Sequence, residues 1–145
     1  MLRDGARIAL RRRVPNALFV VAAIEQLPSE LDRRADVVTV NFPWGSLLRG
    51  LVRADDAVLG PLARLAKCGA PLHALLSVEP RDRASGLATA HPKTLVANAP
   101  AYARAGFDLL ECRAATRGDV DASGSSWAKR LGRDRAVVAL ALRRM

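Results

Sequence analysis

A short polar and aromatic segment, Asn41-Phe42-Pro43-Trp44, directly follows four β-branched residues at 37–40. β-Branched residues favour a β-strand, and Pro43 with Gly45 must end it. Open α/β sheets bind their ligands at the carboxyl ends of their strands, so this turn is a candidate ligand site. The alternative is a strand end whose two aromatic rings pack beneath a helix.

Excess positive charge lies at the two ends of the sequence. Residues 1–13 contain five arginines and one aspartate, residues 127–145 contain six basic residues and one aspartate, and the net charge of the chain is +9. The intervening residues are neutral overall. Clustered arginines and lysines bind phosphates, which favours a nucleic-acid partner. The alternative is that these charges are solvated helix faces, because charge alone specifies no partner.

The composition suits one domain, residues 1–145, with an aliphatic core, since 50% of the residues are hydrophobic and only 4% are aromatic. No run approaches the roughly 20 apolar residues that span a bilayer, and no signal peptide opens the sequence. Cys68 and Cys112 are expected to be reduced and buried, which fits a cytoplasmic protein. No spacing of histidine, cysteine and acidic residues predicts a metal site.

Predicted strands and helices alternate along the chain. The strands are expected at 17–22, 36–42, 71–78, 107–113 and 135–142, and the helices at 1–13, 29–34, 46–53, 55–66, 94–105 and 125–131. A loop is expected at 118–124. This alternation predicts an α/β fold with a mostly parallel sheet, in which the strand at 107–113 lies near an edge.

Segments that are far apart in the sequence carry a family resemblance. Residues 41–48 and 125–131, together with 20–28, resemble the aminoglycoside-resistance 16S rRNA adenine-N1 methyltransferases of the kanamycin–apramycin type, which act on adenine 1408. The resemblance covers nearly the whole chain. It implies a Rossmann-like fold, S-adenosylmethionine (SAM) as cofactor and methyl transfer to 16S rRNA in the 30S ribosomal subunit. It also implies antibiotic resistance as the outcome. We expect a monomer in the cytoplasm with no membrane association.

The resemblance further implies roles for individual residues. Trp44 and Trp127 would hold a flipped adenine between them, Pro43 would shape the methyl-transfer pocket, and Ser125 would orient the loop of Trp127. The cofactor-binding residues would be Ala23, Glu25, Asn41 and Ser46, with Glu25 near the adenine of SAM. The rRNA phosphates would be held by Lys129, Arg130, Arg133 and Arg135. An arginine just past the tryptophan helix is important in the family, and Arg133 and Arg135 both fit it.

The sequence departs from the family at the cofactor site. A SAM enzyme of this class needs a glycine-rich loop after its first strand and an acidic residue at the end of its second. Gly5 follows no strand and Asp4 follows no apolar run. We therefore expect an N-terminally truncated methyltransferase domain that lacks the first two strands, with an exposed edge along the strand at 36–42. Weak or absent SAM binding by these 145 residues alone is the expected consequence.

Two other functions remain open. The basic ends also fit a catalytically inactive, RNA-binding remnant of the same family. Asn41-Phe42-Pro43-Trp44 also resembles the Asn-Pro-Pro-aromatic motif of enzymes that methylate the amino group of adenine. Only one proline is present, however, and the second tryptophan motif does not belong to that group.

Overall fold

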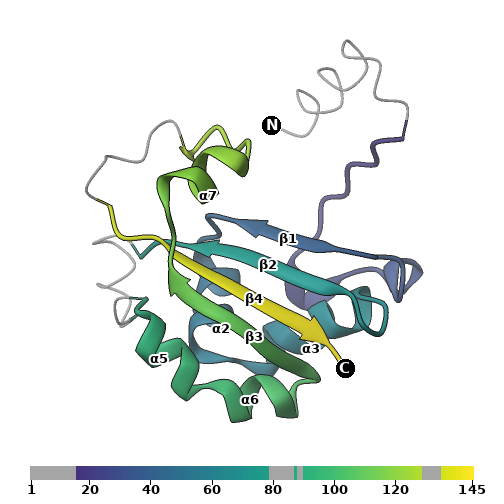
Figure 1. Ribbon diagram of the computed structural model, residues 1–145. Helices are drawn as coiled ribbons and strands as arrows, with labels where there is room; N and C mark the ends of the chain where they lie inside the picture. The colour runs from purple at the N-terminus through teal and green to yellow at the C-terminus, as the bar shows by residue number, and fades with distance from the viewer. Residues whose placement is uncertain (1–15, 79–86, 88–89, 129–134) are drawn as a thin grey trace.

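A four-stranded sheet organises the computed structural model, which describes residues 16–78, 87, 90–128 and 135–145 (Figure 1). The strands are β1 (Val38–Asn41), β2 (Pro71–Leu76), β3 (Phe107–Ala114) and β4 (Val138–Arg144), in the order β1-β2-β4-β3. β1 and β2 pair in parallel, and β4 pairs antiparallel with both β2 and β3. Three strands therefore share one direction. The α/β class is confirmed, but the described sheet is mixed rather than mostly parallel, because β4 is inserted in the opposite direction.

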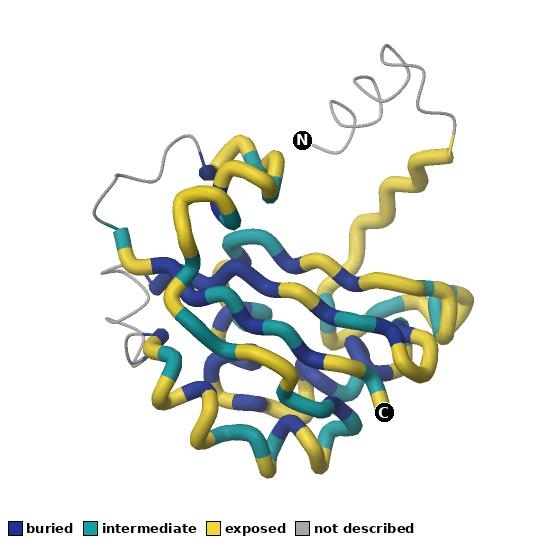
Figure 2. Tube along the Cα trace, in the orientation of Figure 1, coloured by how far each residue is buried: buried dark blue, intermediate teal, exposed yellow. Residues whose placement is uncertain are grey.

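Helices cover one face of this sheet (Figure 1). They are α2 (Gly45–Arg53), α3 (Asp56–Leu65), α5 (Pro92–Ala97) and α6 (Ala99–Arg104). Alternate strand residues such as Val40, Leu72 and Leu140 face the helices and form the main core with them. Figure 2 shows the resulting line of buried positions along the strands. The burial alternates along β1 and β4 because successive side chains point to opposite faces of a sheet.

Polar side chains fasten the helices to one another. The Tyr102 hydroxyl in α6 donates to the Leu51 carbonyl in α2 at 2.6 Å, and the Asn98 amide donates to the Val52 carbonyl at 2.9 Å. Asn98 separates α5 from α6, so the single helix expected at 94–105 is in fact two. Pro100 follows this break, and a proline has no N–H to continue a helical hydrogen-bond ladder.

The segment before β1 differs most from expectation. Residues 17–22 are extended but belong to no strand, and Leu18 and Val21 are each 79% exposed. Unpaired main-chain groups must remain in water, and no described strand lies beside this segment to pair with it. The predicted strand at 17–22 is therefore wrong for the described structure. β1 is an edge strand, as expected, with no described strand on its outer side.

Two predicted helices are shorter than expected or only partly described. The helix expected at 29–34 is a single 3-10 turn, η2 (Ser29–Leu31), which follows another such turn, η1 (Ile24–Gln26). The helix expected at 125–131 begins as a turn at 125–128, and its remainder lies outside the described residues, as does the basic helix expected at 1–13.

The loop expected at 118–124 is wrong, because residues Arg117–Ala122 form the helix α7. Cys68 is exposed and Cys112 is half-buried, so the expectation of burial fails for Cys68, although both cysteines are free. Within the described ranges, no helix is long and apolar enough to cross a membrane.

Candidate functional site

The turn after β1 presents Trp44 to solvent. Phe42 has a φ of 52° and Gly45 a φ of 65°, both in the left-handed region. That conformation is unfavourable for a bulky residue, particularly one that precedes a proline, and costs on the order of 1–3 kcal/mol. Pro43 is buried, whereas Trp44 is 65% exposed. The alternative of two aromatic rings packed beneath a helix therefore does not describe Trp44.

A second loop, which follows α7, carries Trp127. The main-chain N–H of Trp127 donates to the Ser125 hydroxyl at 3.2 Å, and the N–H of Ser125 donates to the Ser123 hydroxyl at 3.2 Å. The Ser123 hydroxyl in turn donates to the Val120 carbonyl at 2.7 Å. Trp127 is 43% exposed. Ser125 thus fixes the main chain at Trp127, and successive serines tie this loop to α7.

The two tryptophan-bearing loops lie against each other. The Asn41 side chain, at the end of β1, donates to the Ser123 carbonyl at 3.4 Å. Phe42 packs against a small second core that includes Val120 and Ala128. Residues within a few positions of each tryptophan are therefore in contact, although 82 positions separate Asn41 from Ser123. The structure brings the two predicted motifs together at the carboxyl end of β1.

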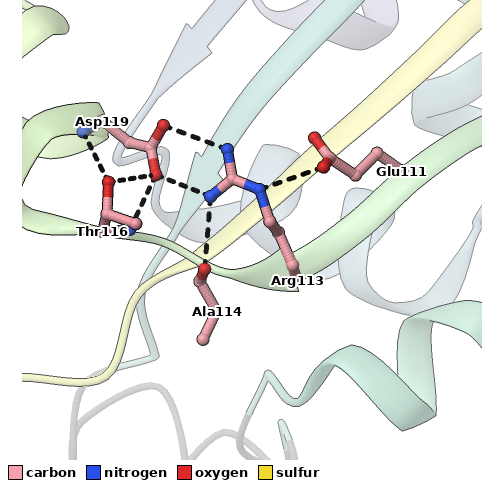
Figure 3. A network of polar contacts seen from close by, with 5 residues as sticks. All are labelled: Glu111, Arg113, Ala114, Thr116 and Asp119. Carbon is pink, nitrogen blue, oxygen red and sulfur yellow. Dashed lines mark hydrogen bonds and ion pairs between the residues drawn. The ribbon is translucent and has the colours of Figure 1, made fainter.

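A charged network at the start of α7 was not foreseen from the sequence (Figure 3). Arg113 in β3 pairs with Asp119, and Asp119 and Thr116 form a capping box at the helix N-terminus. The Arg113 guanidinium, and next the N–H and hydroxyl of Thr116, hold the pKa of the Asp119 carboxyl well below its usual range. The Thr-x-x-Asp spacing of residues 116–119 is the signal that could have predicted this helix start.

Three of the predicted cofactor residues lie at or near the N-terminal end of α2, which contains Ser46. The Ser46 hydroxyl hydrogen-bonds the Glu25 carboxylate, and this bond, more than the nearby Arg49, lowers the pKa of Glu25. Ala23 precedes η1 and is exposed. An ionised carboxylate here can accept a hydrogen bond from an N–H or O–H of a nucleoside, which fits the adenosine end of SAM. The fourth residue, Asn41, is instead engaged with Ser123.

A groove of about 320 Å³ lies between α7 and the face of the sheet that the other helices leave uncovered. Its lining includes Thr39, Asn41, His73, Arg113, Asp119 and Ser123. Of the predicted RNA-binding residues, Arg135 is described and half-buried, while Lys129, Arg130 and Arg133 lie outside the described residues. The choice between Arg133 and Arg135 therefore stays open.

Solved structures share this fold. The aminoglycoside resistance methyltransferase NpmB1 is 37% identical with a TM-score of 0.73, over 90% of this chain and 62% of that one. A 16S rRNA (adenine(1408)-N(1))-methyltransferase from Catenulisporales acidiphilia, solved with its cosubstrate SAM, is 32% identical with a TM-score of 0.73, over 86% of this chain and 59% of that one. The fold is thus that of the SAM-dependent methyltransferases.

Sequence comparisons define the family more closely. An rRNA methyltransferase of Saccharopolyspora hirsuta is 35% identical over 126 residues, which are 83% of this chain and 80% of the relative. The family model NpmA, 16S rRNA (adenine(1408)-N(1))-methyltransferase, matches residues 3–145. The chain belongs to this family. It spans 59% and 62% of the lengths of the two solved relatives above.

Proposed function

We propose that this chain is part of an enzyme that transfers a methyl group from SAM to N1 of an adenine in 16S rRNA. The observation that carries the proposal is the contact between the loops of Trp44 and Trp127, each of which exposes an indole. We further propose that residues 1–145 belong to one methyltransferase domain. When bound, SAM supplies an electrophilic methyl group on its sulfonium sulfur.

The two tryptophans would give the methyl donor access to N1 of the adenine. An adenine within helical RNA must be flipped out of its stack, at a cost of a few kcal/mol. A base stacked on an aromatic side chain gains roughly 1–3 kcal/mol. Trp44 and Trp127, one on each loop, can hold the extruded base between two ring faces. The strained backbone at Phe42 and the buried Pro43 fix the direction from which Trp44 approaches.

Methyl transfer then requires correct placement of adenine N1 relative to the methyl carbon more than it requires acid or base catalysis. Adenine N1 already carries a lone pair, so no residue has to remove a proton before it attacks the methyl carbon. Methylation leaves the purine ring cationic, and an indole face stabilises a nearby cation. Correct orientation of two reactants can account for much of a barrier reduction. Ser125, by fixing the main chain of Trp127, contributes to that orientation.

Cofactor binding by this chain would be partial. Glu25, with Ala23 and Ser46 beside it, would accept hydrogen bonds from the adenosine of SAM, and Asn41 would bound the site at the end of β1. The sequence contains no glycine-rich loop after an apolar strand to let main-chain N–H groups approach the rest of the cofactor. We therefore propose that these 145 residues bind SAM weakly.

The proposed substrate is 16S rRNA within the 30S subunit. Lys129, Arg130, Arg133 and Arg135 follow Trp127 in the sequence and would hold the phosphates beside the flipped nucleotide. Such contacts position an enzyme without reading sequence, so target choice would come from the folded shape of the subunit. We propose a monomer that acts in the cytoplasm, where ribosomes are, and aminoglycoside resistance as the result.

Primer extension on 16S rRNA tests this proposal, because a methyl group on N1 blocks Watson–Crick pairing and stops reverse transcription. Small subunits are incubated with excess SAM and either the chain alone or the chain joined to the portion of NpmB1 that it does not cover. A new stop at one adenine is the expected result with the joined protein. Salt-dependent rRNA binding without any new stop would contradict it and support the inactive RNA-binding remnant.

A further inference from the structure

A network of charge-assisted hydrogen bonds fixes the start of α7 to the end of β3 (Figure 3). Arg113 donates from Nη1 to one carboxylate oxygen of Asp119 at 2.6 Å and from Nη2 to the other at 3.1 Å. Its Nε also donates to Glu111 at 3.1 Å. Asp119 accepts in addition from the main-chain N–H of Thr116 at 2.7 Å. A two-pronged pair with further partners is more rigid than an isolated surface ion pair.

The helix that this network holds is too short to be stable alone. α7 has six residues, and its one buried side chain is that of Val120. Isolated helices shorter than about 12–15 residues are marginal in water. The position of α7 therefore depends on its attachment at the N-terminal end by Arg113 and Asp119, and on Val120 in the small second core.

The same helix determines where the loop of Trp127 begins. Ser123 directly follows α7, accepts from Asn41 through its carbonyl, and accepts from the N–H of Ser125 through its hydroxyl. Ser125 then accepts from the N–H of Trp127. A continuous chain of hydrogen bonds thus leads from the C-terminal end of α7 to Trp127 and to the end of β1.

We propose that Arg113 and Asp119 are positioning residues for Trp127. By fixing α7 to β3, they determine where the second indole lies relative to Trp44. The consequence for adenine binding rests on the proposed function, but the positioning itself concerns only this chain. It can therefore be tested without rRNA or SAM.

The two tryptophans make the test specific. In a Trp44→Phe protein the fluorescence comes from Trp127 alone, and in a Trp127→Phe protein it comes from Trp44 alone. Adding Arg113→Gln should increase acrylamide quenching of Trp127 and leave Trp44 unchanged. Loss of this charge-assisted pair should also make hydrogen exchange of the α7 amides roughly fivefold faster. Asp119→Asn keeps a capping side chain but removes the charge, and should produce the same contrast.

Arg117→Gln is the matched control. Arg117 pairs with Asp121 at 3.1 Å within α7, and this pair does not reach β3. Its loss should alter neither tryptophan. Unchanged quenching of Trp127 in both Arg113→Gln and Asp119→Asn would overturn the proposal. Equal changes at Trp44 and Trp127, or unfolding of both variants, would also overturn it, because the two residues would then support the whole fold. If methyl transfer is never detected, the proposed function fails but the fluorescence contrast is unaffected.

Discussion

The side-chain amide of Asn41 donates a hydrogen bond to the main-chain carbonyl of Ser123, 3.4 Å away. Asn41 ends the edge strand β1, and Ser123 directly follows α7. This bond joins the turn that carries Trp44 to the loop that carries Trp127. Because neither loop has regular structure at its tryptophan, the relative position of the two indoles depends on such bonds and on the packing of Phe42.

Replacement of Asn41 should therefore show what this bond contributes. Asn41→Ala removes one donor and should reduce the free energy of unfolding by about 1 kcal/mol. Asn41→Asp should cost more, because an ionised carboxylate then faces the Ser123 carbonyl and has no proton to donate. Urea denaturation at neutral pH measures both. Wild-type stability of the Asn41→Asp protein would show that the two loops are not joined in this way.

Two helical glycines should respond differently to alanine. A Cβ at Gly50 in α2 would overlap the side chain of Val58, whereas a Cβ at Gly60 in α3 would meet nothing within 4 Å. Gly60→Ala should change stability little, because the helix propensity that alanine gains is offset by Pro61, whose ring disfavours the helical conformation of a preceding residue that carries a Cβ. Gly50→Ala should destabilise it by about 1–3 kcal/mol through overpacking. Thermal unfolding of the two variants tests the packing of α2 against α3. Equal changes in the two melting temperatures would contradict this packing.

Acid should weaken the protein partly through Asp119. Its pKa is lowered in the folded state, mainly by Arg113, so its contribution to stability is complete above the ordinary aspartate pKa of about 4. As pH falls below that value, the unfolded state takes up a proton first and unfolding becomes easier. The urea midpoint should thus fall less between about pH 5 and about pH 3 in Asp119→Asn than in the wild type. Parallel curves for the two proteins would contradict the role assigned to this carboxylate.

The affinity for the cofactor is a separate prediction. The proposed SAM site has only one side, formed by Ala23, Glu25 and Ser46. Calorimetric titration of the 145-residue chain with S-adenosylhomocysteine should therefore give a dissociation constant weaker than micromolar. Glu25→Gln should weaken any measurable binding further, because a neutral amide accepts a less strong hydrogen bond. Micromolar affinity for the wild-type chain would show that the glycine-rich loop is not needed.

Most of the regular elements were predictable because their residues agree with one another locally. The β-branched run at 37–40, the apolar run that begins at Pro71 and the helix expected at 55–66 each have one favourable structure, and each forms much as expected. The strand predicted at 17–22 fails for a different reason. Its apolar residues favour an extended chain, but a strand also needs a neighbour, which no local pattern supplies.

The residues of the candidate site could be predicted from the sequence, but the contacts that bring them together could not. Trp44 and Trp127 were found through the family resemblance, and their exposure agrees with a role in binding. Two contacts depend on where α7 lies relative to the strands. The Asn41–Ser123 bond needs α7 near the end of β1, and the Arg113–Asp119 pair needs it near the end of β3. Spacing along the chain does not specify these positions. The left-handed conformation of Phe42 could not be predicted from the sequence either, because aromatic residues disfavour that conformation.

The central claim is that Trp44 and Trp127 together hold the target adenine. Its most direct test is the rate of methyl transfer to small ribosomal subunits with SAM in excess, measured for the joined protein and its Trp44→Ala and Trp127→Ala variants. Each variant should be slower by roughly 5- to 150-fold, as expected for the loss of one stacked ring, while circular dichroism shows an unchanged fold. Wild-type rates in both variants would contradict the claim.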